Sequence, residues 1–294
     1  MSHIAALATV TAWGVSFVST RVLLDNGLSP TEAFIYRTIL AYLLLLCVCH
    51  RQFMSNSMRD EFLFVACGLC GSSLYFIAEN TALEYTLVSN VSLIVTLAPL
   101  ITTLLVGALY KTERPSRGMI VGSVVAFLGV GCVIFNSSFV VKIKPLGDML
   151  ALAAACTWAV YSLVLRKLSA FYTALYITRK TFFYGILTAL PFYFAEPGHV
   201  SLTVFAKPAV WANFLFLGVF CSMFAFLLWA WVVKRIGAIK ANNYLYIQPI
   251  VTLVASALIL HERVSLIGYI GCALILFGLW LGERLSVKRP AGHP

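Results

Sequence analysis

Residues 6–21 read ALATVTAWGVSFVSTR, and residues 151–166 read ALAAACTWAVYSLVLR. The two stretches share an Ala-Leu-Ala triplet, a Trp, a Val and a closing Arg in the same register. Each lies in an apolar block of about twenty residues, the length of helix that crosses a hydrocarbon layer of about 30 Å. A repeated apolar segment of this length predicts a membrane protein built from two related halves.

The composition of the whole chain agrees with this interpretation. Of the 294 residues, 61% are apolar and only 11% are charged, against about a quarter charged in an ordinary soluble domain. A helix is expected in each apolar block, because a helix satisfies its own backbone hydrogen bonds in lipid. The sequence therefore predicts an all-α polytopic membrane protein with ten transmembrane helices. Their expected ranges are 4–24, 31–50, 62–82, 86–110, 117–136, 147–167, 172–195, 209–234, 238–260 and 264–284.

The basic residues predict how the chain is oriented. Most of the 21 lysines and arginines lie in loops on the side of both termini, and the positive-inside rule places that side in the cytoplasm. The net charge of +10 forms no basic stripe, so the expected partner is the lipid bilayer and not nucleic acid. The first apolar run has no positive charge before it, unlike a cleaved signal peptide, and is expected to remain as the first helix.

The correspondence between the halves continues beyond the opening segment. Arg37 corresponds to Arg179, and Pro99 to Pro249. Further along, Glu113-Arg114 corresponds to Glu262-Arg263, and Gly122 and Gly129 correspond to Gly271 and Gly278. The expected halves are residues 1–139 and 140–294, the second with a short cytoplasmic tail. Because each half holds five helices, the second begins on the opposite side of the membrane, which makes an inverted repeat. Such repeats commonly underlie alternating access; a duplication with a purely structural role is the alternative.

These residues resemble the EamA type of the drug/metabolite transporter superfamily. The resemblance rests on Trp13-Gly14, Ser29-Pro30 with Arg37, Pro99, Glu113-Arg114, Gly122 and Gly129, and on their echoes in the second half. It implies a ten-helix transporter of an inner or plasma membrane, often an exporter of amino acids or other small metabolites. It also implies a central cavity lined mostly by the first, third, fourth, sixth, eighth and ninth helices. Trp158-Ala159 and the polar pair Glu79-Asn80 depart from the family pattern.

Aromatic and polar side chains on these helices are the candidate substrate contacts. They are Trp13, Ser16, Tyr75, Asn90, Trp158, Tyr161, Trp229, Asn242, Asn243, Tyr246 and Gln248. An aromatic wall suits an apolar or cationic solute, and tight core packing is the alternative. Uncharged polar groups in lipid either line a cavity or join neighbouring helices.

Two prolines and three basic residues are expected inside the spans. Pro99 and Pro249 should kink or open their helices and are candidate hinges beside the substrate site, with a fixed kink as the alternative. Arg37, Arg179 and Lys180 lie at a depth where charge is costly. We expect carbonyls or carboxylates to anchor them, and the less favoured role is binding a substrate carboxylate.

Glu79 is the one acid expected within a span, with no second buried acid. It is either a proton-coupling carboxylate or, as we favour, an interfacial acid that pairs with Arg37 or faces water. Small residues on the fifth and tenth helices predict close helix packing within one chain or in a homo-oligomer. They are Gly118, Gly122, Gly268, Gly271, Gly278 and Gly282.

The leading hypothesis is a secondary transporter, an exporter of a small metabolite such as an amino acid. An efflux pump for many drugs or cationic compounds is the alternative. The chain has no P-loop motif, so ATP is not expected to drive it directly. An enzyme is disfavoured because His261-Glu262 lacks the following His of a zinc motif, and a channel because no filter-like loop is evident. No cofactor or metal is expected, since the eight cysteines all lie in apolar blocks.

Overall fold

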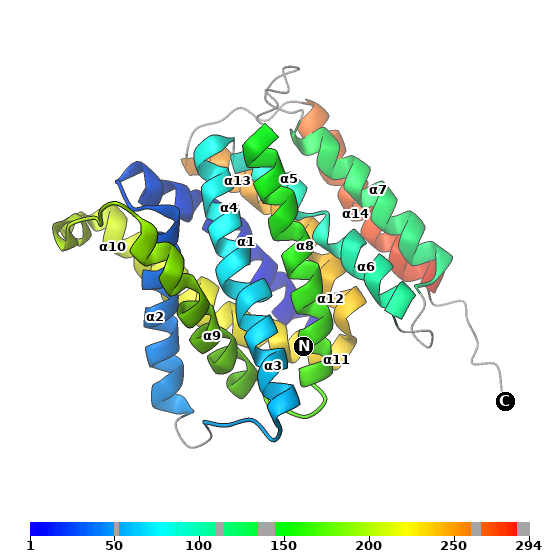
Figure 1. The fold of residues 1–294 in the computed structure, drawn as a ribbon. Helices are drawn as coiled ribbons and strands as arrows, with labels where there is room; N and C mark the ends of the chain where they lie inside the picture. Colours follow the sequence, from blue (N-terminus) through cyan, green and yellow to red (C-terminus); the bar gives the residue numbers. More distant parts are fainter. Residues whose placement is uncertain (50–52, 87, 110–114, 135–144, 260–265, 287–294) are drawn as a thin grey trace.

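The computed structural model describes residues 1–49, 53–86, 88–109, 115–134, 145–259 and 266–286, which form helices and no strands (Figure 1). The first half contains α1 (Ser2–Asp25), α2 (Pro30–Val48), α3 (Met58–Gly68), the π-helix η1 (Leu69–Ser73), α4 (Leu74–Tyr85), α5 (Val88–Val95), α6 (Ala98–Leu109) and α7 (Arg117–Ile134). The second contains α8 (Pro145–Leu168), α9 (Ala174–Ala195), η3 (Leu202–Ala206), α10 (Pro208–Leu215), the π-helix η4 (Phe216–Phe224), α11 (Ala225–Ile236), α12 (Ala238–Asn243), η5 (Tyr244–Ile247), α13 (Gln248–Ile259) and α14 (Leu266–Ser286).

Several helical stretches are long and apolar enough to cross a bilayer. Among the described residues they are Ser2–Asp25, Pro30–Val48, Met58–Tyr85, Pro145–Leu168 and Pro208–Ile236, and shorter apolar helices accompany them. Large apolar side chains such as Leu104, Leu128, Phe220 and Tyr269 are exposed, as side chains that face lipid would be. The chain is therefore an all-helical, multi-pass membrane protein.

Local sequence signals set where α2 begins. Asn26-Gly27 ends the first span, and Gly27 has φ +98°, a left-handed conformation that glycine adopts without strain. Ser29 then caps α2, because its side chain accepts from the backbone N–H of Glu32 while the Glu32 carboxylate accepts from the N–H of Ser29. Pro30 occupies the first turn, where its missing N–H costs nothing.

Two predicted spans are divided rather than continuous. The range 86–110 holds α5 and α6 with a turn at residues 96–97 between them, and Pro99 is the second residue of α6. The range 238–260 holds α12, the 3₁₀ turn η5 and α13, and Pro249 is the second residue of α13. These breaks agree with the expectation that each helix kinks or opens at its proline. Proline is tolerated in a first turn, so the new helix begins with it.

The third span of each half carries a different irregularity. Between α3 and α4 lies the π-helix η1, and between α10 and α11 lies the π-helix η4. A π segment widens the helix by one residue and turns the side chains that follow onto a new face. The two spans that correspond in the predicted repeat therefore deviate from α-helix in the same way.

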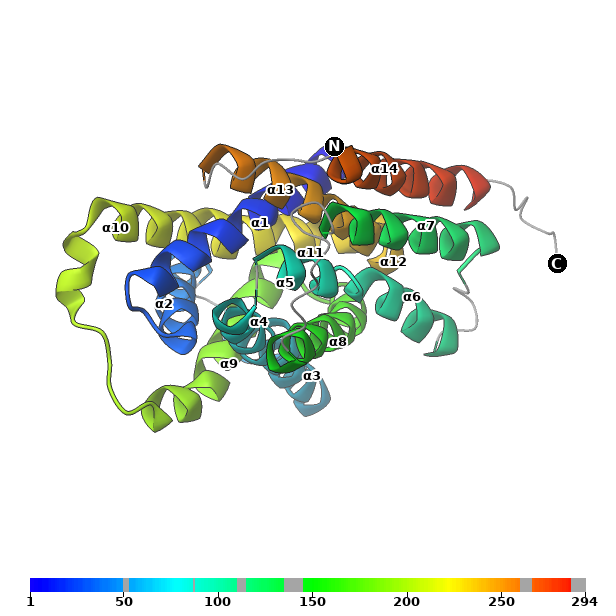
Figure 2. The same ribbon diagram turned by 90° about the horizontal axis from the view of Figure 1, so that it is seen from above.

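The helices of one half pack mainly on those of the other. The α4–α8 contact has its counterpart in α11–α1, and the contact of α5 and α6 with α8 has its counterpart in α13–α1. Likewise α3 packs on α9 as η4 packs on α2, while α2–α9 and α7–α14 each join two helices that correspond in the predicted repeat. The main core thus lies between the halves, and α7 and α14 lie side by side at one edge (Figure 2).

Glycines allow α7 and α14 to touch along their backbones. A Cβ placed on Gly122 would lie 2.5 Å from the Gly278 carbonyl oxygen, and one on Gly129 would lie 2.7 Å from the Gly271 carbonyl oxygen. The small-residue faces predicted from the sequence therefore pack inside one chain.

Candidate functional site

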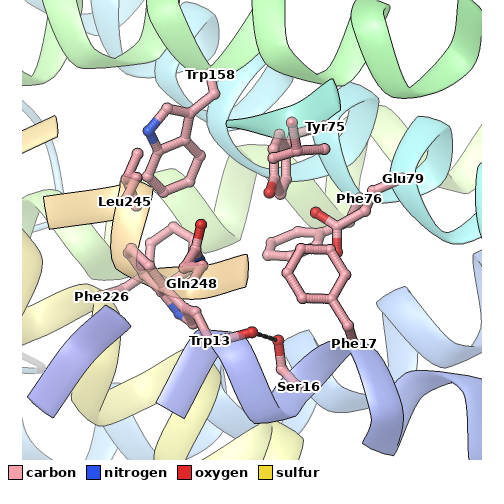
Figure 3. Close-up of a pocket in the computed structure, with 11 residues that line it drawn as sticks. Trp13, Ser16, Phe17, Tyr75, Phe76, Glu79, Trp158, Phe226, Leu245 and Gln248 are labelled. Atoms are coloured by element: carbon pink, nitrogen blue, oxygen red, sulfur yellow. Dashed lines mark hydrogen bonds between the residues drawn. The ribbon is translucent and has the colours of Figure 1, made fainter. Parts of the chain in front are cut away.

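A cavity lies where the helices of the two halves meet (Figure 3). It is lined by Trp13, Ser16, Phe17, Tyr75, Phe76, Glu79, Val95, Trp158, Phe226, Leu245 and Gln248. Its volume is about 20 Å³, room for one or two water molecules. A solute of amino-acid size therefore enters only if the surrounding helices move apart.

Two tryptophans that correspond in the predicted repeat, Trp13 and Trp158, form two walls of the cavity. The rings of Trp13 and Trp158 meet edge to face, with centroids 5.2 Å apart and planes at 87°. Trp13 Nε1 donates to the Cys221 carbonyl oxygen at 2.9 Å, and Trp158 Nε1 donates to Asn242 Oδ1 at 3.1 Å. Both indoles are thus buried, hydrogen-bonded and fixed in orientation before a solute arrives.

The helix α4 supplies the third wall. Tyr75 and Glu79 are four residues apart and so share one face of α4. The Tyr75 ring lies 5.0 Å from the Trp158 ring and 4.9 Å from the Phe76 ring, between centroids. Sequence reasoning missed Phe76 as a lining residue, since a single phenylalanine in an apolar block carries no distinguishing signal.

The base of the cavity depends on a close approach of α1 and α13. A Cβ on Gly14 would lie 2.6 Å from the Val251 Cβ and 3.1 Å from the Gln248 carbonyl oxygen. The Thr252 hydroxyl also donates to the Gly14 carbonyl oxygen at 2.9 Å. Gly14 therefore brings Gln248, as predicted, into the same cavity as Ser16.

Three predicted contacts lie behind the cavity wall and not on it. The Tyr161 ring packs on Trp158 and the Trp229 ring packs on Trp13, with centroids 5.1 and 5.2 Å apart. Asn242 is fully buried and holds Trp158 while its Nδ2 donates to the Ala238 carbonyl oxygen. Helical spacing correctly predicted the side of the helix but not the depth of each side chain.

The remaining predicted contacts lie elsewhere. Tyr246 is buried in a separate cluster with Ala126 and Ile275, because the 3₁₀ turn η5 has a shorter period than an α-helix and redirects it. Asn243 is partly exposed and outside the lining set. The side chain of Asn90 lies outside the described residues.

Glu79 is buried, which corrects the expectation of an acid facing water at the interface. Its side chain is 3% exposed, and Oε2 has no hydrogen-bond partner in the described part of the chain. Arg37 is also buried, and its Cζ lies 3.8 Å from the centroid of the Phe76 ring. The guanidinium is close enough to interact electrostatically with Glu79, but Arg37 Nε, like Glu79 Oε2, has no hydrogen-bond partner among the described residues.

Arg179 and Lys180 anchor α9 to the segment that follows α2. Arg179 donates to the carbonyl oxygen of Cys49, and Lys180 donates to that of Phe53 at 2.9 Å. Lys180 also pairs with the Glu61 carboxylate. For Arg179 and Lys180 these are contacts of the kind expected of structural anchors, with carbonyls and a carboxylate, whereas Arg37 lies against the Phe76 ring. Neither residue lines the cavity.

A second polar cluster joins α2 to the segment that follows α9. Glu32 is 1% exposed and accepts from the Val200 N–H at 2.8 Å, and His199 lies 3.5 Å from the same carboxylate. Ser29 donates to Glu196 at 2.7 Å. The expectation that Glu79 is the one buried acid was therefore wrong, because Glu32 at the start of α2 is covered by a loop of the other half. The two clusters lie at opposite ends of the antiparallel pair α2–α9.

Known proteins resemble this chain over almost its full length. A "Probable terminal-alkyne amino-acid exporter" of Streptantibioticus cattleyicolor is 27% identical over 99% of this chain and 96% of its own. A "Probable amino-acid metabolite efflux pump" of Escherichia coli is 23% identical over 94% of this chain and 92% of its own. An "Uncharacterized transporter" of Archaeoglobus fulgidus is 26% identical over 94% and 96%.

A solved crystal structure has the same fold, with a TM-score of 0.77 over 98% of this chain and 99% of the other. The two chains are 18% identical, so this likeness shows the fold alone. The family model matches residues 1–135 and 145–282. The names of the family and of these relatives point to transport and not to an enzymatic activity. The chain belongs to the EamA-like transporter family.

Proposed function

We propose that this protein is a secondary transporter that exports a small metabolite, an amino acid or a close relative, by alternating access around the central cavity. The observation that carries the proposal is the reciprocal packing of the two halves. Where a helix of the first half packs on a helix of the second, the corresponding helix of the second half packs on the corresponding helix of the first. Two such halves can swap conformations and so present the cavity to each side in turn. The exporter names of two relatives support the direction and the substrate class.

The proposed architecture has ten membrane spans in two inverted five-helix repeats, residues 1–139 and 140–294. Both termini face the cytoplasm, and the protein resides in the cell membrane. Two helix irregularities that recur in both halves support the proposal of two repeats. The third spans share a π segment, and the fourth spans share a break just before a proline.

The two polar clusters on the α2–α9 pair suit such a cycle. One ties Glu32 to the segment after α9, and the other ties Lys180 to Glu61. In our proposal each end of the pair opens while the other stays closed, and the helix breaks at Pro99 and Pro249 take up the change in backbone geometry. Since the cavity holds only one or two waters, a movement of this kind is required for any solute.

Counterflow in liposomes tests the proposal. Purified protein is reconstituted with an unlabelled amino-acid mixture inside, and uptake of each labelled amino acid is followed with and without a pH gradient. Saturable uptake that depends on the internal solute supports a carrier. An ohmic current without saturation would identify a channel instead and overturn the proposal.

An efflux pump for cationic compounds is the second candidate, because aromatic rings and a carboxylate line the cavity. The same liposomes distinguish the two. Ethidium that exchanges as fast as any amino acid, with no saturable amino-acid counterflow, favours the efflux pump.

A further inference from the structure

Among the described residues that line the cavity, Glu79 is the one charged side chain. Its Oε2 atom is buried and has no hydrogen-bond partner in the described structure, while the Tyr75 hydroxyl and the Arg37 guanidinium lie near the carboxylate. A buried acceptor without a donor is costly. A hydrogen bond that a solute donates to this atom therefore contributes more binding free energy than the same bond would at a hydrated surface.

The rings around this carboxylate also favour positive charge. Figure 3 shows the Glu79 carboxylate beside Tyr75, Phe76 and Phe17, with Trp13 and Trp158 across the cavity. The face of an aromatic ring carries negative partial charge and attracts ammonium groups, most strongly when water is excluded. The Glu79 carboxylate and the aromatic rings thus both favour a positively charged group in the cavity.

The nearby cation does not reverse this preference. Arg37 stacks on the Phe76 ring at 3.8 Å and is not among the residues that line the cavity. It balances the charge of Glu79 in the empty protein and leaves the cavity itself to a solute. A solute whose only charged group is a carboxylate would place it against Glu79 and the ring faces, both of which repel an anion.

We infer that the cavity binds the ammonium group of its solute, with the Glu79 carboxylate as the counter-charge and the aromatic rings enclosing the cation. The inference rests on the proposed transport function and names its substrate class. The solutes are primary amines and amino acids recognised by the amino end, and not carboxylic acids that lack an amino group.

Matched probes test this inference on the purified full-length protein. Phenethylamine, 3-phenylpropionate and 2-phenylethanol have similar sizes but differ in charge, and butylamine, butyrate and butanol form a smaller set. Binding is measured by quenching of tryptophan fluorescence, to which Trp13 and Trp158 contribute from the cavity wall, and by calorimetry. We expect the amine to bind at least tenfold more tightly than the acid and the alcohol in one or both sets.

Substitutions on one helix provide the controls. Glu79→Gln removes the charge while keeping the shape, and should weaken amine binding at least tenfold without weakening alcohol binding. Glu79→Asp should retain part of the amine affinity. Glu84→Gln makes the same change at an exposed position of α4 and should leave all affinities within twofold.

Equal affinity for amine and acid in both sets overturns the inference, as does a monodisperse Glu79→Gln protein with undiminished amine binding. If that variant does not fold, the comparison of amine and acid binding to the unsubstituted protein still tests the inference. Saturable counterflow of solutes that lack an amino group, without preference for amines, would refute the inference and leave the transport proposal standing. Amine binding without counterflow of any solute would refute the transport proposal and leave the ligand assignment.

Discussion

The contact between α7 and α14 gives the sharpest test of the fold. In Gly122→Ala the new Cβ would lie 2.5 Å from the Gly278 carbonyl oxygen and 2.6 Å from the Gly282 Cα. Ordinary contact begins at 3.4 Å, and backbone atoms cannot rotate away as a side chain can. The two helices must therefore separate by about 1 Å, which loosens the packing along their whole length.

The magnitude follows from two opposing effects. Overpacking against a rigid neighbour costs about 1–3 kcal/mol, while alanine is favoured over glycine within a helix by up to about 1 kcal/mol. We expect a net loss of about 1–2 kcal/mol for Gly122→Ala. The matched control is Gly131→Ala on the same helix, where a Cβ would meet no heavy atom within 4 Å, so stability should stay constant or rise by up to about 1 kcal/mol.

Thermal unfolding of both variants in a mild detergent, followed by intrinsic fluorescence, measures the difference. At about 2–4 °C per kcal/mol for a chain of this size, Gly122→Ala should melt several degrees below the unsubstituted protein and Gly131→Ala should not. A melting temperature for Gly122→Ala at or above that of the unsubstituted protein would refute the close backbone contact. An equal loss for both variants would show that the loss does not depend on the contact with α14, and the explanation by contact would fail.

Other perturbations probe the supports of the cavity and the ends of the bundle. Asn242→Leu leaves the buried Trp158 N–H without an acceptor, so stability should fall by about 1–3 kcal/mol, whereas Asn242→Asp keeps an acceptor; denaturant titration separates them. Glu61→Gln breaks a largely buried ion pair with Lys180 and should lower the free energy of unfolding by about 3 kcal/mol. A double variant that adds Lys180→Met should recover part of this loss, and one that is no more stable than Glu61→Gln alone would refute the pairing. Pro249→Ala should slow counterflow severalfold while amine binding stays within twofold, since it lets α13 extend backwards; unchanged counterflow would contradict a hinge.

Many features were accessible from the sequence because they depend on local patterns. The apolar length of α1 and α8, the capping box at Ser29 and the helix openings at Pro99 and Pro249 each follow from residues within one or two turns. Pairing Trp13 with Trp158 required only the internal repeat. Trp13, Ser16, Tyr75, Trp158 and Gln248 were all predicted as cavity residues, and all five line the cavity.

What the sequence by itself determined is which segments are helical and apolar, and which side of α1 and α8 bears aromatic groups. How deeply each polar side chain is buried, and which residues it contacts, were decided only by tertiary packing, because both depend on residues far away in the chain. Glu32 is buried because Val200 and His199 of the other half cover it. Glu79 is in the cavity and not in water because α8 and α2 pack on α4. Tyr246 turned away from the cavity because η5 is a 3₁₀ turn, and helical spacing alone cannot anticipate a change of helix type.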